Sequence, residues 1–287
     1  MPGMAHDNFR FQEGIFVLRR PLKHRQEDYS EESFATLSRM ESSHFWYRGR
    51  HKFLFWHVRR IVGCDFSRFQ VLDMGAGTGA WTKYLLQHKV QPRLIAVADS
   101  SPTAVKLARE SLPNKVVCYQ TDILEPVWDS EWDIIFCLDV LEHLTQPEQA
   151  VTNLRRALKP NGLLFITVPA LKVFWSWVDE MAQHKRRYSR KDLAELAKAC
   201  QLRVVDIRYF MFLLSPLVWV SRRLIDRKVK QANPELRKLI CDRHHRVPTW
   251  LINEILYGIF ALEAPLSCAV RFPWGTSLLG VFRRTNG

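Results

Sequence analysis

Short runs of apolar residues alternate with stretches of helical periodicity through most of the chain. Several of these runs are followed within a few residues by an acid, which is typical of buried parallel strands whose carboxyl ends carry polar groups. The segments between them place apolar residues at helical spacing. The pattern predicts a doubly wound α/β sheet. The expected strands begin at Phe69, Leu94, Val116, Trp132, Leu163, Leu202 and Ser277.

Three parts of the chain depart from this alternation. Residues 1–33 are polar, mixed in charge and without clear periodicity, so we expect an N-terminal arm. Residues 34–68 have apolar and aromatic residues at helical spacing and predict N-terminal cap helices. About seventy residues separate the sixth and seventh strands, far more than a hairpin needs. We therefore expect a core of 69–210 and 276–287, with 211–275 as a helical insertion that serves as a substrate lid or a membrane-facing element.

The first strand leads directly into a glycine-rich loop. Asp73 is followed by Gly75, Gly77 and Gly79 at alternate positions, and a helical pattern begins near Trp81. Glycine suits a tight turn in which a ligand lies against the backbone. The start of the following helix offers unpaired N–H groups to an anionic ligand. The spacing differs from the dinucleotide fingerprint, which needs two residues between its last two glycines.

Acidic residues also follow the next three strands. Asp99 lies at the end of the second strand, where a carboxylate accepts hydrogen bonds from both ribose hydroxyls in nucleotide-binding folds. Asp122 and Asp139 follow the third and fourth. A single acid after a strand is common and can simply form a turn. Together with the glycine loop, the acids favour a nucleoside-containing cofactor.

Three motifs in order resemble class I S-adenosylmethionine-dependent methyltransferases of type 11, which act on small-molecule and lipid acceptors. They are Asp-x-Gly-x-Gly-x-Gly, Asp-Val-Leu-Glu-His-Leu from Asp139, and Ala-Leu-Lys-Pro-Asn-Gly-Leu-Leu from Ala157, and the match covers residues 69 to about 168. The resemblance implies a seven-stranded Rossmann-like sheet with an antiparallel last strand and S-adenosyl-L-methionine as cofactor. It implies cofactor contacts for Trp46, Tyr47, Arg50, Asp73, Gly75, Ala76, Gly77, Thr78, Gly79, Asp99, Ser100, Asp122, Ile123, Leu138 and Asp139.

The same resemblance suggests roles for individual residues. Asp122 would bond the adenine amino group and Ile123 would pack on the ring. The His-Phe-Trp-Tyr segment that starts at His44, with Arg50, resembles a segment that closes over the methionine end in a subgroup of the family. The alternative interpretation of this segment is that its aromatic side chains belong to the hydrophobic core.

Two histidines are the candidate catalytic residues. His143 follows Glu142, and His184 begins the basic loop His-Lys-Arg-Arg-Tyr. An imidazole titrates near neutral pH and can take a proton from a hydroxyl nucleophile. The alternatives are a helix-capping histidine and a solvated charge run. If a helix began at Asp139, Asp139, Glu142 and His143 would share one face; some ubiquinone-type O-methyltransferases hold a divalent metal with such a set. We expect no metal.

Charge is concentrated beyond the fifth strand. The chain has a formal net charge of +13, and residues 184–246 carry 17 Lys and Arg against 6 Asp and Glu. Beside the apolar runs 211–220 and 250–272, this charge suits an interfacial element on an anionic membrane. An insertion that packs on the core and solvates its charges is an equal alternative. We expect Phe210 and Trp219, with Trp46 and Tyr47, to form apolar walls of the substrate site.

The function that fits best is O-methylation of a small apolar or lipid-linked acceptor. The alternatives are an RNA or other nucleic-acid methyltransferase, favoured by the charge, and a non-catalytic scaffold that binds the cofactor. The chain lacks Asn-Pro-Pro-Tyr or Asp-Pro-Pro-Tyr after the fourth strand, a motif that is expected when the amine of a nucleobase is the acceptor. No RNA-binding module is recognisable either, and both observations argue against a nucleic-acid acceptor. The cysteines are scattered, no signal-peptide pattern is present, and no run of about 18 uninterrupted apolar residues occurs. These features predict a cytoplasmic protein, either free or peripheral on the membrane. The pattern leaves the oligomeric state open.

Overall fold

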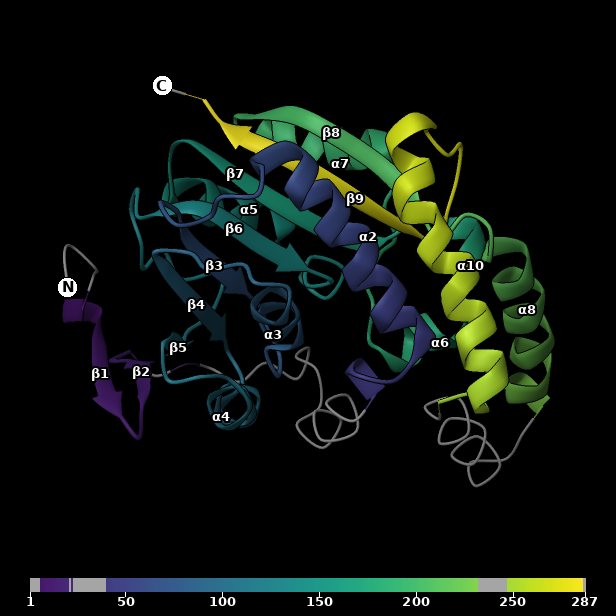
Figure 1. Cartoon of the computed structure of the whole chain (residues 1–287), viewed down its shortest axis with the longest axis horizontal. Coiled ribbons are helices and arrows are strands. Elements are labelled where there is room, and N and C mark those ends of the chain that lie inside the picture. Colours follow the sequence, from purple (N-terminus) through teal and green to yellow (C-terminus); the bar gives the residue numbers. More distant parts are fainter. Residues whose placement is uncertain (1–5, 21, 23–39, 232–246, 286–287) are drawn as a thin grey trace.

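A nine-stranded mixed sheet forms the centre of the molecule. The computed structural model describes residues 6–20, 22, 40–231 and 247–285. The strand order is β1-β2-β5-β4-β3-β6-β7-β9-β8 (Figure 1). The strands from β5 to β7 are parallel, whereas β9 lies antiparallel between β7 and β8. The seven predicted strands are β3 (Gln70–Met74), β4 (Leu94–Asp99), β5 (Val116–Gln120), β6 (Trp132–Leu138), β7 (Leu158–Pro169), β8 (Leu202–Phe210) and β9 (Ser277–Arg284).

Two further strands extend the sheet at the N-terminal edge, within the segment expected to be an arm. β1 (Phe9–Gln12) and β2 (Ile15–Leu18) form a hairpin, and β2 pairs in parallel with β5. Phe9 is buried and its ring lies 5.0 Å from that of Tyr119. Each strand has only four residues, so apolar and polar residues alternate over too short a stretch to stand out in the sequence.

Helices cover both faces of the sheet, and their starts follow the sequence signals. Ser101 Oγ accepts a hydrogen bond from Ala104 N at 3.1 Å, and Ser189 and Asp192 form a capping box at the start of α7. Two buried apolar clusters lie on the two faces. The helices are α2 (Phe45–Val62), α3 (Ala80–Gln87), α4 (Pro102–Ser111), α5 (Pro147–Ala157), α6 (Trp177–Met181), α7 (Arg190–Ala199), α8 (Ser215–Gln231) and α10 (Trp250–Ala269).

The insertion contributes α8 and α10, and α10 lies along α2 (Figure 1). Gly49 permits the close approach, because a Cβ there would overlap the ring of Phe260. Asn253 Oδ1 accepts from Phe45 N and its Nδ2 donates to Ser43 O, each at 2.9 Å. Arg48 forms a salt bridge with Glu254. The basic residues 232–246 of the insertion lie outside the described part of the chain.

A buried histidine between α2 and α10 predicts that the stability of the fold is sensitive to acid. His57 Nε2 lies 2.8 Å from Ser267 Oγ, and burial, with a smaller effect of Arg208, lowers the pKa of His57 from 6.5 to about 4. The unfolded chain therefore binds the proton more readily than the folded chain. Stability is lost as the pH falls through the window between about 6.5 and about 4, which the two pKa values bound. The expected loss at the acid end is on the order of 3 kcal/mol.

The test compares wild type with His57→Gln. Denaturant titrations at pH values inside and above the window give the free energy of unfolding of each protein. We expect the wild type to lose more stability than the variant as the pH falls. Equal pH dependence in the two proteins would contradict this account of His57.

Candidate active site

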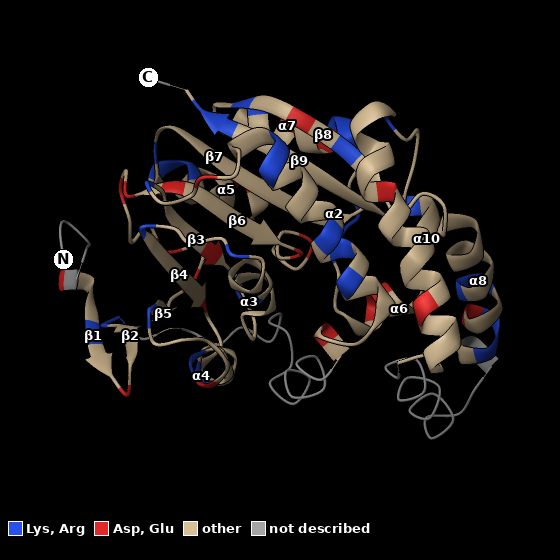
Figure 2. Cartoon of the chain, viewed as in Figure 1, with Lys and Arg blue, Asp and Glu red and all other residues tan. Residues whose placement is uncertain are grey.

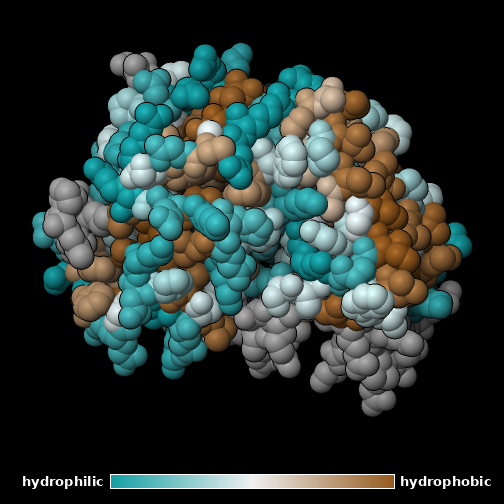
Figure 3. All heavy atoms as spheres, viewed as in Figure 1, coloured by the Kyte–Doolittle hydropathy of each residue, from teal (hydrophilic) through white to brown (hydrophobic). Residues whose placement is uncertain are grey.

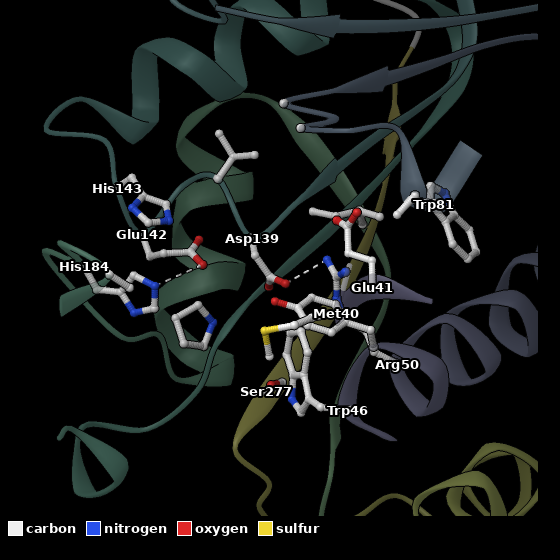
Figure 4. Close-up of a pocket in the computed structure, with 18 of the residues that line it drawn as sticks. Met40, Glu41, Trp46, Arg50, Trp81, Asp139, Glu142, His143, His184 and Ser277 are labelled. Carbon is white, nitrogen blue, oxygen red and sulfur yellow. Dashed lines mark ion pairs between the residues drawn. The ribbon is translucent and has the colours of Figure 1, made fainter. Parts of the chain in front are cut away.

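A large cavity lies at the carboxyl ends of the parallel strands. Its volume is about 960 Å³, within the range of small-molecule sites. The glycine loop and the acids that follow β4, β5 and β6 line one part of it, and α2 contributes Trp46, Tyr47 and Arg50. The insertion adds an apolar wall. Figure 4 shows the charged and aromatic side chains converging on this space.

The glycine loop adopts a backbone that requires glycine. Gly75 has a φ of 71°, and a Cβ there would overlap Val140 Cγ2. The N–H groups of Gly75 and Ala76 donate to the carbonyl oxygen of Ala98 at 2.8 and 3.1 Å, which fixes the loop against β4. The loop thus exposes bare backbone to the cavity.

Thr78 and Gly79 belong to the same loop but do not line the cavity. Thr78 Oγ1 donates to the carboxylate of Glu41. Gly79 has a φ of 82°, and a Cβ there would come within 2.7 Å of Leu112 Cδ1. Thr78 thus ties the loop to Glu41, and Gly79 lies where the loop packs against the end of α4.

The acids after β3 and β4 have different environments. Asp73 is buried and accepts from Thr82 Oγ1 at 2.9 Å; burial raises the pKa of Asp73 to about 7. Asp99 accepts from Gly77 N at 2.9 Å and from Ser101 N at 3.0 Å. Its carboxylate therefore organises the glycine loop and also borders the cavity. The cavity wall continues with Ser100, Asp122, Ile123 and Leu138.

Asp139 pairs with Arg50 across the cavity. Arg50 Nη2 lies 2.7 Å from Asp139 Oδ2, and its guanidinium lies 5.4 Å from the centre of the Trp46 ring. No helix begins at Asp139, so the condition for a shared helical face is not met: the residue has a φ of 56°, turns follow it, and α5 begins at Pro147. Asp139 consequently faces Arg50 instead of sharing a helical face with Glu142 and His143.

His184 is held by a buried charged pair. Its Nδ1 lies 2.9 Å from Asp179 Oδ1, and Arg187 Nε donates to the same oxygen at 2.7 Å. Burial alone would raise the pKa of Asp179, but the hydrogen bond from His184 and the charge of Arg187 together hold it at about 2. An ionised Asp179 favours the tautomer with the proton on Nδ1, which leaves Nε2 as an acceptor.

His143 and Glu142 lie beside His184 (Figure 4). The two imidazole rings are 4.8 Å apart, and His184 Nε2 is 4.0 Å from Glu142 Oε1. Burial, and next the charge of Asp139, raises the pKa of Glu142 well above its ordinary value. Burial, and next His184, lowers the pKa of His143 to about 4. At neutral pH His143 is therefore neutral and a weak base.

Among the described residues, Glu142, His143 and His184 also form a group whose ligand atoms lie within 4.8 Å of one another. This differs from the set considered in the sequence, because His184 takes the place of Asp139. A carboxylate with two imidazoles could hold a divalent metal, but Glu142 would first have to lose the proton that burial favours.

The cavity thus joins residues that the sequence singled out with others that it did not. All the expected cofactor residues except Thr78 and Gly79 line it, as do His143 and His184. Phe210 and Trp219 were expected as substrate walls and do not line it: Phe210 stacks on Phe53 in the core, and Trp219 is 42% exposed. Residues that the sequence analysis missed include Met40, Glu41, Thr121, Asp179, Arg187, Met211, Leu214, Leu217, Val218, Arg222 and Leu256.

Comparison with known proteins shows the family to which this chain belongs. A family described as a methyltransferase domain matches residues 40–207. The ubiquinone biosynthesis O-methyltransferase of Rickettsia typhi is 30% identical over 103 residues, which is 36% of this chain and 42% of that protein. The enzyme of the same name from Idiomarina loihiensis is 26% identical over 160 residues, 50% of this chain and 65% of that protein. The matches thus span less than two thirds of these relatives.

Solved structures share the fold at low identity. A chain from the complex between the Haloferax volcanii Trm112 methyltransferase activator and its methyltransferase partner covers 92% of this chain and 99% of its own length, with a TM-score of 0.59 and 17% identity. The phosphoethanolamine N-methyltransferase 2 of Haemonchus contortus, solved with S-adenosyl-L-methionine, covers 91% of this chain and 59% of its own, with a TM-score of 0.55 and 14% identity. With the domain match over more than half of its length, this chain belongs to the class I S-adenosylmethionine-dependent methyltransferases.

Proposed function

We propose that this chain transfers a methyl group to a hydroxyl oxygen of a small apolar or lipid-linked acceptor, with His184 as the general base. The observation that carries the proposal is the Asp179–His184 pair on a cavity whose wall from the insertion is mainly apolar. A base in that place suits a hydroxyl, which must lose its proton on methylation.

The donor end of the cavity fits S-adenosylmethionine. Gly75 presents backbone where a Cβ has no room, and Asp99 and Asp122 offer carboxylates to ribose and adenine. The hydroxyl of Thr121 is buried at the same wall and has no hydrogen-bond partner within the described structure. When bound, the cofactor supplies a methyl group activated by a positively charged sulfur. We assign its methionine end to Arg50, Trp46 and Tyr47, which line the opposite side.

His184 is better prepared than His143 to take the proton of the acceptor. Asp179 holds the Nδ1 proton of His184 and stabilises the imidazolium that forms. Nε2 is 4.0 Å from Glu142 Oε1, beyond hydrogen-bond distance, so an acceptor hydroxyl can approach it. Burial lowers the pKa of His143 to about 4, so this ring accepts a proton poorly at neutral pH.

The acceptor end is mainly apolar. Met211, Leu214, Leu217 and Val218 line it from the start of the insertion, and Leu256 lines it from α10. Arg222 adds a cation, whose pKa burial lowers to about 10. Apolar walls with few polar groups are typical of sites that bind a mainly apolar compound in a fixed orientation. Methylation of oxygen also agrees with the names of the ubiquinone biosynthesis relatives.

A labelled extract tests the proposal. The protein is incubated with S-adenosylmethionine carrying a labelled methyl group and with a cell extract divided into lipid, small polar, RNA and protein fractions. We expect the label in the lipid or apolar small-molecule fraction. Label that enters only RNA or protein would overturn the proposed acceptor class, and cofactor binding measured by calorimetry shows that the protein used is competent.

A further inference from the structure

The insertion exposes an unusual number of large apolar side chains. Most of the exposed large apolar residues in the described part of the chain belong to 211–275. Trp250 is 77% exposed, the highest value among them. Figure 3 shows the hydrophobic residues gathered over α10 and α8. Isolated exposed apolar residues are ordinary, but a contiguous group of this kind marks an interaction surface.

These residues form regular stripes along the two helices. On α10, the exposed residues Leu251, Ile255, Leu262 and Leu266 recur at spacings of four and seven, which places them on one helical face. On α8, Leu217, Val220 and Leu224 are exposed at spacings of three and four. We call these two stripes, with Trp250, the apolar face.

Positive charge lies next to the apolar face. Arg223, Arg227 and Lys228 are exposed on α8, and Arg271 follows α10 with 67% of its side chain exposed. Figure 2 shows the basic residues on α8. An apolar stripe with Lys and Arg beside it complements the headgroup region of a bilayer that contains anionic lipid. A partner protein with an apolar surface would not by itself require this charge.

We propose that the apolar face binds an anionic membrane surface, with α8 and α10 lying in the plane of the interface. α10 is long and apolar enough to span a membrane, with a mean hydropathy of 1.3, and is the one such helix in the part of the chain that the structure describes. Its contacts favour the interfacial arrangement: Asn253 and Glu254 bind α2, and Glu263 is buried and accepts a hydrogen bond from Leu213 N at 2.7 Å.

The cavity borders this surface. Leu217 is 56% exposed in the apolar stripe of α8 and also lines the cavity, and Leu256, next to Ile255, lines it from α10. A lipid-linked acceptor could therefore pass from the bilayer into the site without crossing water. This passage rests on the proposed function, whereas the docking rests on the surface alone.

Vesicle flotation tests the docking. Full-length protein is mixed with phosphatidylcholine vesicles that contain or lack phosphatidylglycerol. We expect the protein to float with the anionic vesicles, and we expect high salt to release part of the bound protein from them. The variant Leu251→Glu/Ile255→Glu/Leu262→Glu should lose its bound fraction by about tenfold or more, because three charges replace the apolar stripe. A second variant, Arg227→Glu/Lys228→Glu, should lose the preference for anionic lipid.

Phe11→Glu is the control for placing a carboxylate on an exposed apolar side chain. Phe11 is 64% exposed on β1, at the opposite end of the sheet from the insertion, so this single change should leave flotation unaltered. Cofactor binding by calorimetry confirms that each variant is folded. Failure of the wild type to float, or equal flotation of the stripe variant, would overturn the docking. Sedimentation that shows a dimer dispersed by the stripe variant, without flotation, would assign the face to a second copy of the chain.

Flotation needs no methyl acceptor, so the two proposals fail separately. A protein that floats but methylates no apolar compound overturns the proposed function alone. A protein that methylates an apolar compound without binding vesicles overturns the docking alone.

Discussion

His184→Asn is expected to reduce methyl transfer by about a hundredfold to ten-thousandfold while the affinity for S-adenosylmethionine is unchanged. The asparagine amide can take the place of Nδ1 and still donate to Asp179, which keeps the charged pair with Arg187 in a similar environment. It removes Nε2, the nitrogen that we assign as base. Single-turnover rates with saturating cofactor measure the loss directly.

The corresponding change at the neighbouring histidine provides the comparison. His143→Asn alters a side chain in the same cluster, 4.8 Å from His184 between ring centres, but leaves the Asp179–His184 pair in place. We expect its effect on transfer to be much smaller. If the two variants lost activity equally, or if His143→Asn lost more, the assignment of the base to His184 would be wrong.

We expect Gly75→Ala to weaken the binding of S-adenosylmethionine by about a hundredfold. The new Cβ would overlap Val140 Cγ2, and the φ of 71° adds strain of about 1–2 kcal/mol for any residue with a Cβ. Relief of the overlap has to move the loop that borders the cavity. Calorimetry with S-adenosylmethionine measures the change in affinity.

Gly63→Ala separates backbone strain from the loss of space. Gly63 ends α2 with a φ of 94°, but a Cβ there would meet nothing within 4 Å. This variant should lose some stability and keep its affinity for the cofactor. Unchanged affinity in Gly75→Ala, measured on folded protein, would contradict the place of the glycine loop in the cofactor site.

The part of the cavity that we propose as the donor half could be located from the sequence, because its signals are local. Asp73 and the three glycines lie within seven residues, and the helix caps at Ser101 and Ser189 depend on side chains a few residues away. Asp99 lies at the end of an apolar strand, so its place at the edge of a parallel sheet follows from the pattern alone.

The acceptor half depends on contacts that no local pattern records. Arg48 and Glu254 are separated by 206 residues, so no local pattern indicates that α2 pairs with α10. Asp179 lies only five residues before His184, but in a short helix and loop without periodicity, and its role becomes visible only when Arg187 is seen beside it. Residue spacing alone also could not decide whether a helix begins at Asp139, because it carries no information on the left-handed backbone that this residue adopts.

The acceptor atom in the labelled product tests the central claim most directly. The product formed by wild-type protein from an apolar extract is isolated, and tandem mass spectrometry locates the transferred methyl group. We predict a methyl group on oxygen in an apolar compound, formed by the wild type and not by His184→Asn. A methyl group on nitrogen or carbon, or label found only in RNA or protein, would contradict the account.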